Sequence, residues 1–228
     1  MLIRRSNERG HARQDWLTSW HTFSFADYYD PQYMGFGNIR VINEDIVAPN
    51  SGFGTHPHRD MEIITYMLSG ELKHEDSMGN GAIIHPDEIQ VMSAGTGIRH
   101  SEINPSENTS AHLLQIWIVP DTKGVKPRWE QKIFARETKM NQLRLLVSKD
   151  GRDGSLMIHQ NTDLYASVLE PGKDLLLPSS KNPFFIHVVA GDLKVGDTKL
   201  LSGDAIMGDS FGEFRVQTSG GAEILVFL

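Results

Sequence analysis

The fold of this chain is indicated by the stretch Ile64-Thr65-Tyr66-Met67-Leu68-Ser69-Gly70-Glu71-Leu72-Lys73. β-Branched and aromatic residues precede Gly70, which favours a strand that ends in a turn. A similar stretch recurs in the second half of the chain, as Ile186-His187-Val188-Val189-Ala190-Gly191-Asp192-Leu193-Lys194. Each copy is followed by a turn that contains an aspartate, Asp87 or Asp204, and then by a further short apolar segment. Two copies of one β unit predict two related β domains.

Short segments of the same kind occur along the whole chain and are separated by clusters of Gly, Pro, Asn and Asp. This spacing is typical of a sandwich or barrel built from many short strands. Two segments, 14–20 and 130–138, are predicted to form short helices. The predicted strands cover residues 37–42, 62–68, 89–92, 113–119, 143–147, 164–169, 184–189 and 224–228.

Composition limits the classes of function. The chain has 228 residues, is 39% hydrophobic and can bury a sizeable core. Its net charge of -7 argues against a nucleic-acid-binding surface. It contains no cysteine, which excludes disulfides and Cys-ligated zinc and leaves His, Asp and Glu as ligands for a transition metal. The first residues lack the apolar stretch of a secretory signal, and no apolar run is long enough to span a bilayer, so we predict a cytoplasmic protein.

Two short motifs, His56-Pro57-His58 and His100-Ser101-Glu102, suggest a metal site. Residues two apart on a strand point to the same face, so two neighbouring strands could bring three imidazoles and a carboxylate together. Imidazole suits zinc, copper, iron and nickel. A structural zinc site is usually closed and mostly Cys-ligated, whereas three His and one Glu on a cation that prefers six ligands leave two positions open for chemistry. The second repeat has no such pair, and its isolated His159 and His187 are expected to be surface or hydrogen-bonded core residues.

Three longer motifs resemble the pirin family of the cupin superfamily, and the resemblance is strongest over residues 10–120. It implies two tandem cupin barrels, with a metal-binding barrel at residues 1–130 and a degenerate barrel at residues 131–228. The motifs are Trp16-Leu17-Thr18-Ser19-Trp20-His21-Thr22-Phe23-Ser24-Phe25, Gly54-Thr55-His56-Pro57-His58-Arg59-Asp60-Met61-Glu62 and Met92-Ser93-Ala94-Gly95-Thr96-Gly97-Ile98-Arg99-His100-Ser101-Glu102.

The resemblance to pirins implies that one metal ion is held by His56, His58, His100 and Glu102. The general cupin pattern nominates Glu62 in place of Glu102, and both carboxylates satisfy strand parity with a histidine. We favour Glu102 because the pirin match is the longer one. Glu62 is then expected to be an acid or base near the metal, or a hydrogen-bond partner of a ligand imidazole. Iron(II) is the expected ion, and nickel, cobalt, copper, manganese and zinc also suit these ligands.

The resemblance also implies a function. Several bacterial pirins are similar to quercetin 2,3-dioxygenases, so we predict a metal-dependent dioxygenase that cleaves flavonols such as quercetin with dioxygen. The substrate hydroxyl would lose its proton to Glu102 or Glu62 before ring cleavage releases carbon monoxide. Another enolic or aromatic metabolite is an open alternative for the substrate. The animal pirins are nuclear co-regulators, which suggests a second alternative: a regulatory protein whose metal redox state controls a protein partner.

Several large side chains lie in or near these motifs. Trp16 and Phe25 are expected to pack the first barrel rather than line a ligand pocket. Met67 and Met92 are also expected to be core residues. Gln115 is expected to border the cavity by strand parity.

Overall fold

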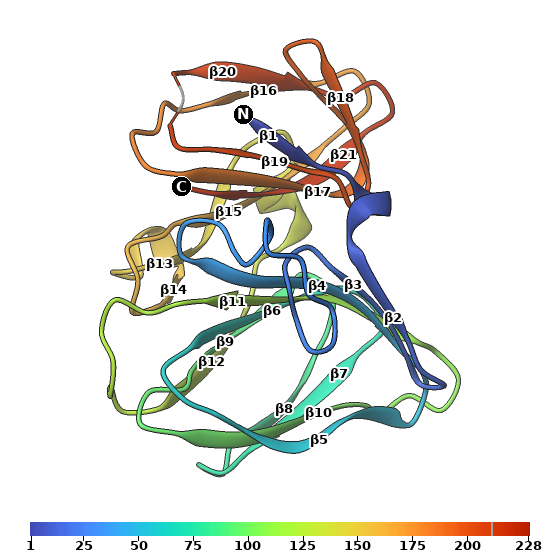
Figure 1. The fold of residues 1–228 in the computed structure, drawn as a ribbon, viewed down its shortest axis with the longest axis vertical. Coiled ribbons are helices and arrows are strands. Elements are labelled where there is room, and N and C mark those ends of the chain that lie inside the picture. The colour runs from blue at the N-terminus through green and yellow to red at the C-terminus, as the bar shows by residue number, and fades with distance from the viewer. Residues whose placement is uncertain (211) are drawn as a thin grey trace. The chain divides into compact units, whose positions relative to one another are not determined.

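The computed structural model describes residues 1–210 and 212–228 and forms two compact units. One unit contains residues 10–134 and 156–161, and the other contains residues 1–9, 135–155 and 162–228. Each unit is built almost entirely of antiparallel strands, as the sequence predicted (Figure 1). The motifs with paired histidines all lie in the first of these units.

The unit with the paired histidines consists of two sheets that face each other (Figure 1). The larger sheet has the strand order β12-β9-β6-β11-β4-β3-β2, and the smaller has the order β5-β10-β7-β8. The strands of these two sheets are β2 (Gly10–Arg13), β3 (Leu17–His21), β4 (Ile39–Val47), β5 (Ser51–His58), β6 (Glu62–Ser69), β7 (Leu72–Asp76), β8 (Gly81–Ile84), β9 (Glu88–Ser93), β10 (Ile98–Asn104), β11 (Ala111–Ile118) and β12 (Arg128–Ile133). The short strand β14 (Leu156–Met157) belongs to neither sheet.

The interior of this unit is layered. On β6, alternate residues face inward, so Ile63 and Met67 enter two separate apolar clusters. Ile63 packs with Met92, and Met67 packs with Leu113, which confirms both methionines as core residues. Thr65 lies between Ile63 and Met67 on the same face and is fully buried. A polar layer therefore separates the two apolar clusters.

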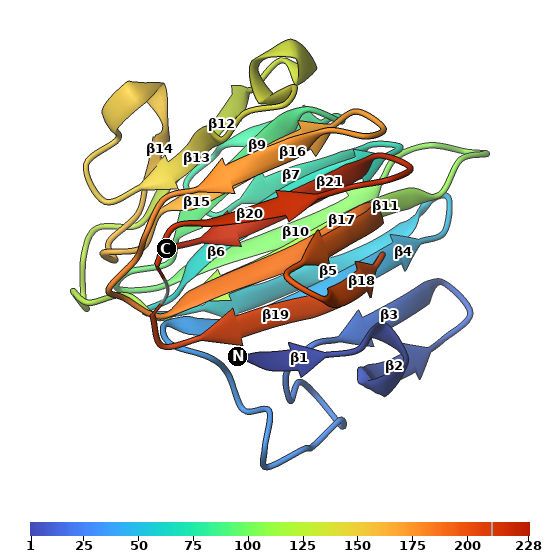
Figure 2. The same cartoon turned by 90° about the horizontal axis from the view of Figure 1, so that it is seen from above.

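The other unit has one sheet with the order β1-β19-β17-β21-β15-β13, to which β16, β18 and β20 are attached. The first strand of the chain, β1, pairs with β19, and Figure 2 shows the two side by side. The elements of this unit are β1 (Leu2–Arg4), η1 (Ser6–Glu8), η2 (Arg136–Lys139), β13 (Arg144–Ser148), η3 (Arg152–Gly154), β15 (Leu164–Leu169), β16 (Asp174–Leu177), β17 (Phe184–Val195), β18 (Thr198–Leu201), β19 (Ala205–Gly208), β20 (Phe214–Gln217) and β21 (Ala222–Phe227).

Every strand predicted from the sequence is present, but both predicted helices are wrong. Most of segment 14–20 belongs to β3, which pairs with β4 from Leu17 opposite Val47 onward. Segment 130–138 begins within β12, which pairs with β9, and only the short 3-10 turn η2 follows. Pairing with a distant strand outweighs weak local helix periodicity. No helix in the described part of the chain is long and apolar enough to cross a membrane.

Candidate metal centre

Three imidazoles converge between β5 and β10. His56 lies directly opposite His100 in the register, and His58 lies opposite Ile98. His56, His58 and His100 each offer a ring nitrogen, and these three nitrogens lie within 4.8 Å of one another. The ring centroids are 4.5 Å apart for His56 and His100 and 4.9 Å apart for His58 and His100. The two motifs therefore meet as strand parity predicted.

A β-bulge sets the local geometry. His100 is paired with His56, but Glu102 is paired with Phe53, so the register between β5 and β10 shifts by one residue. A bulge of this kind bends a strand and re-aims its side chains. Gly52 permits the close approach, because its φ is +155° and a Cβ there would lie 2.2 Å from the carbonyl oxygen of Glu102.

The ring nitrogens are suited to a metal ion. Nδ1 of His56 lies 2.8 Å from the carbonyl oxygen of Gly54 and donates to it, which leaves Nε2 with a free lone pair. Nε2 of His100 is buried and has no hydrogen-bond partner in the part of the chain that the structure describes. Burial, together with the neighbouring imidazoles, lowers the pKa of His58 and of His100 to about 3, so both rings are neutral at neutral pH. Neutral imidazoles around an unpartnered nitrogen fit a divalent metal ion.

Glu102 lies on the same strand as His100, with its side chain almost completely buried. Its carboxylate accepts three hydrogen bonds from the larger sheet. Gln115 Nε2 donates to Oε2 at 2.7 Å, whereas Gln90 Nε2 and Thr65 Oγ1 donate to Oε1 at 3.1 and 3.2 Å. Burial raises the pKa of Glu102 despite these donors. These hydrogen bonds hold the carboxylate in a fixed orientation, with its ligand atom within 4.8 Å of those of His74 and His100.

Glu62 does not join the imidazole cluster. It begins β6, and its carboxylate accepts hydrogen bonds from Ser93 Oγ at 2.7 Å and from His159 Nδ1 at 3.1 Å. The parity argument that linked Glu62 to His58 does not hold, because the chain turns between β5 and β6 at Asp60, where φ is 46°. Parity applies only within one continuous strand. The contact with Glu62 agrees with the expectation that His159 is a hydrogen-bonded residue.

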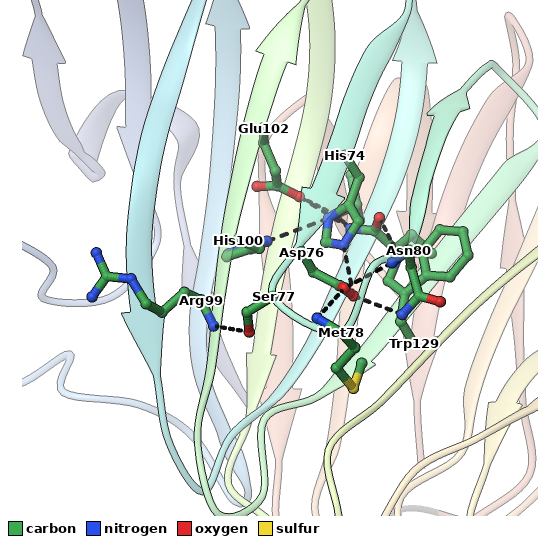
Figure 3. A network of polar contacts seen from close by, with 11 residues as sticks. His74, Asp76, Ser77, Met78, Asn80, Arg99, His100, Glu102 and Trp129 are labelled. Atoms are coloured by element: carbon green, nitrogen blue, oxygen red, sulfur yellow. Dashed lines mark hydrogen bonds and ion pairs between the residues drawn. The ribbon is translucent and has the colours of Figure 1, made fainter.

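A further histidine, which belongs to none of the sequence motifs, contacts His100 directly (Figure 3). His74 on β7 has a fully buried side chain, and its Nδ1 lies 3.3 Å from Nδ1 of His100. Its ring stacks on Trp129 with the centroids 5.4 Å apart. His74, His100 and Glu102 each offer a ligand atom, and these atoms lie within 4.8 Å of one another. The spacing of His74 and Asp76, two apart on a strand, was the available sequence signal.

Asp76 completes this arrangement at the end of β7. Its Oδ2 lies 3.5 Å from Nε2 of His74, near the outer limit of a hydrogen bond. The same carboxylate accepts hydrogen bonds from the backbone N–H groups of Met78 and Asn80 and from Asn80 Nδ2. These donors outweigh its desolvation and lower the pKa of Asp76. An ionised carboxylate thus lies next to His74, and His74 in turn contacts His100.

A cavity of about 630 Å³ opens beside the imidazoles, which form part of its wall. Trp16 packs against the apolar cluster that contains Met67, as expected, but Trp16 and Phe25 also line the cavity, which the sequence did not predict. They flank β3 near the edge of the larger sheet and reach the cavity from there. Trp117 also lines it and packs edge-on against His58 at 4.9 Å between centroids. Gln115 borders the cavity as predicted.

Comparisons with known proteins agree with the fold and with the family that the motifs predicted. Residues 3–118 match the family model described as Pirin, and residues 145–227 match the model described as Quercetinase C-terminal cupin domain. The chain is 45% identical to a quercetin 2,3-dioxygenase of Escherichia coli K12, over 100% of this chain and 97% of that protein. It is 42% identical to a putative quercetin 2,3-dioxygenase of Pasteurella multocida, over 100% and 98%.

Solved structures of a bacterial protein are similar over nearly the whole chain. The bacterial pirin YhhW of Escherichia coli, in complex with nickel(II), has a TM-score of 0.94 and 44% sequence identity to this chain. The match covers 99% of this chain and 97% of that one.

Proposed function

Because the chain belongs to the pirin family, as its motifs predicted, we propose that it is a metal-dependent dioxygenase that cleaves flavonols such as quercetin. The observation that carries this proposal is the cluster of His56, His58 and His100 in the wall of an aromatic-lined cavity. A planar aromatic substrate suits such walls, and neutral imidazoles suit a catalytic metal. Relatives named quercetin 2,3-dioxygenase support the substrate class.

The proposed metal ligands are Nε2 of His56, Nε2 of His100, a ring nitrogen of His58 and the carboxylate of Glu102. Iron(II) is the expected ion, and the nickel(II) complex of a close relative supports nickel as a second candidate. When bound, a divalent ion supplies Lewis-acid stabilisation to a deprotonated substrate hydroxyl. Glu62 is not proposed as a metal ligand, because its carboxylate is hydrogen-bonded to Ser93 and His159.

The residues of the chain have three tasks in this proposal. Trp16, Phe25 and Trp117 bind the planar rings and exclude water from the reacting face. Glu102 transiently accepts the proton of the substrate hydroxyl. Gln115 keeps this carboxylate oriented. In the overall reaction both atoms of dioxygen enter the opened product, and one ring carbon leaves as carbon monoxide.

The test is an anaerobic preparation of the metal-free protein, loaded separately with iron(II), nickel, cobalt, copper, manganese and zinc. Oxygen uptake and carbon monoxide release are then followed with quercetin, and we expect equal amounts of the two gases with at least one metal. A His56→Ala/His58→Ala double variant is the control and should be inactive with every metal. Absence of turnover with all six metals would refute the dioxygenase proposal.

The regulatory alternative stays a prediction. It requires a protein partner whose capture depends on the oxidation state of the bound metal. Redox-dependent capture without any oxygen uptake on quercetin would favour that alternative over the enzyme.

A further inference from the structure

The polar layer inside the metal-binding unit is a row that crosses five neighbouring strands. In the register, His21 lies opposite Asn43, Asn43 opposite Gln115, Gln115 opposite Thr65, and Thr65 opposite Gln90. All five side chains belong to buried residues. Because cross-strand partners lie about 5 Å apart, the row is one continuous strip of polar groups.

One part of this row has an evident task, because Gln115, Thr65 and Gln90 all donate to Glu102. Asn43 lies one strand further from Glu102 and lines the cavity. Its Oδ1 atom is buried and has no hydrogen-bond partner among the described residues, although the residue is only 3% exposed. Native proteins rarely leave a buried acceptor unpaired, so this amide points to a donor that the protein itself does not supply.

Asp45 lies next to Asn43 on the same face of β4. The two are two residues apart on one strand, so their Cα atoms are about 7 Å apart and both side chains line the cavity. Ser19 Oγ donates to Oδ1 of Asp45, and no other side chain in the described ranges supplies a donor. The cross-strand neighbour on the other side is Leu113, which is apolar. Burial raises the pKa of Asp45 to about 7, so near neutral pH the carboxyl is available both as a donor and as an acceptor.

We propose that Asn43 and Asp45 form a subsite that binds a second hydroxyl group of the substrate, distinct from the hydroxyl that reaches the imidazole cluster. A phenolic hydroxyl matches both partners, since it donates its one hydrogen to the Asn43 amide oxygen and accepts a hydrogen bond from the protonated Asp45 carboxyl. The inference rests on the proposed function for the planar aromatic part of the substrate. It adds that the preferred substrates are polyhydroxylated aromatics.

The experiment measures equilibrium binding without turnover. Metal-loaded protein is titrated anaerobically with quercetin and with 3-hydroxyflavone, which carries a single hydroxyl, and binding is followed by quenching of tryptophan fluorescence. We expect quercetin to bind the unchanged protein roughly tenfold more tightly, the worth of about one buried hydrogen bond. Asn43→Ala and Asp45→Ala should each remove most of that preference and leave 3-hydroxyflavone binding within about twofold.

The control variant is Asn108→Ala, whose side chain is exposed, and all variants are checked for metal content and circular dichroism. A preference that survives both cavity variants would overturn the subsite, and so would an equal loss of affinity for the two ligands. Absence of flavonol binding to the unchanged protein would overturn it as well. Because binding is measured without oxygen, a hydroxyl-dependent preference in a protein that fails to turn over quercetin would reject the dioxygenase proposal and retain the subsite.

Discussion

Nδ1 of His74 lies 3.3 Å from Nδ1 of His100 in the buried interior, and this contact determines how His100 can meet a metal ion (Figure 3). Two protonated Nδ1 atoms cannot share one hydrogen bond. If His100 donates from Nδ1, its Nε2 is left for the metal, and His74 must carry its own proton on Nε2, which faces Asp76. The negative charge of Asp76, 3.5 Å from Nε2 of His74, favours this arrangement of protons.

His74→Phe should lower metal affinity by roughly 10- to 100-fold, the usual effect of removing a partner of a ligand imidazole. Phenylalanine keeps the ring that stacks on Trp129, so the loss reports the hydrogen bond rather than the packing. The measurement is competition for nickel(II) or cobalt(II) with a chromophoric chelator. The control is His85→Phe, because the His85 side chain is 54% exposed and outside the cluster. Equal affinities for the two variants would contradict the assigned role.

The two candidate carboxylates can be separated by isosteric variants. Glu102→Gln should weaken metal binding at least as strongly as the loss of His74, since it removes a proposed ligand and its charge. Glu62→Gln should leave metal affinity within about twofold, because its carboxylate is engaged by Ser93 and His159. Metal content after dialysis and chelator competition both measure the difference. The opposite ranking would return Glu62 to the ligand set.

The bulge beside the imidazoles makes a stability prediction with a matched control on the same strand. A Cβ at Gly52 would meet the backbone of Glu102 at 2.2 Å, whereas a Cβ at Gly54 would have no atom within 4 Å. We expect Gly52→Ala to cost roughly 1–3 kcal/mol and Gly54→Ala less than about 0.5 kcal/mol. Thermal unfolding of the metal-free proteins measures both. Similar midpoints for the two variants would show that β5 and β10 do not pack as described.

The raised pKa of Asp45 predicts that the free energy of unfolding of the metal-free protein depends on pH differently from that of the Asp45→Asn variant. Burial raises its pKa from 3.8 to about 7, so the folded state favours the protonated carboxyl. The stability that Asp45 contributes is therefore complete below pH 3.8 and is lost as the pH rises through about 7. Relative to the unchanged protein, Asp45→Asn should gain on the order of 1–3 kcal/mol between pH 5 and pH 8. Urea unfolding at both pH values measures this gain, and a constant difference would refute the raised pKa.

The alternation of side chains along a strand made much of the site predictable from sequence. His56 and His58 share a face, as do His100 and Glu102, and these relationships needed no knowledge of the fold. The apolar segments likewise predicted every strand that was named. The helix predictions at 14–20 and 130–138 failed because short local patterns do not record which distant strand will pair with them.

The sequence by itself determined the β class, the family and the face that each histidine of a pair shares, because these depend on residues close together in the chain. Only the tertiary structure shows that Glu102 lies within reach of His74 and His100 while Glu62 is hydrogen-bonded to Ser93 and His159. It also decided that His74 supports His100 and that Asn43 enters the cavity. Those contacts depend on the register between strands distant in sequence, which is set by pairing across the whole sheet.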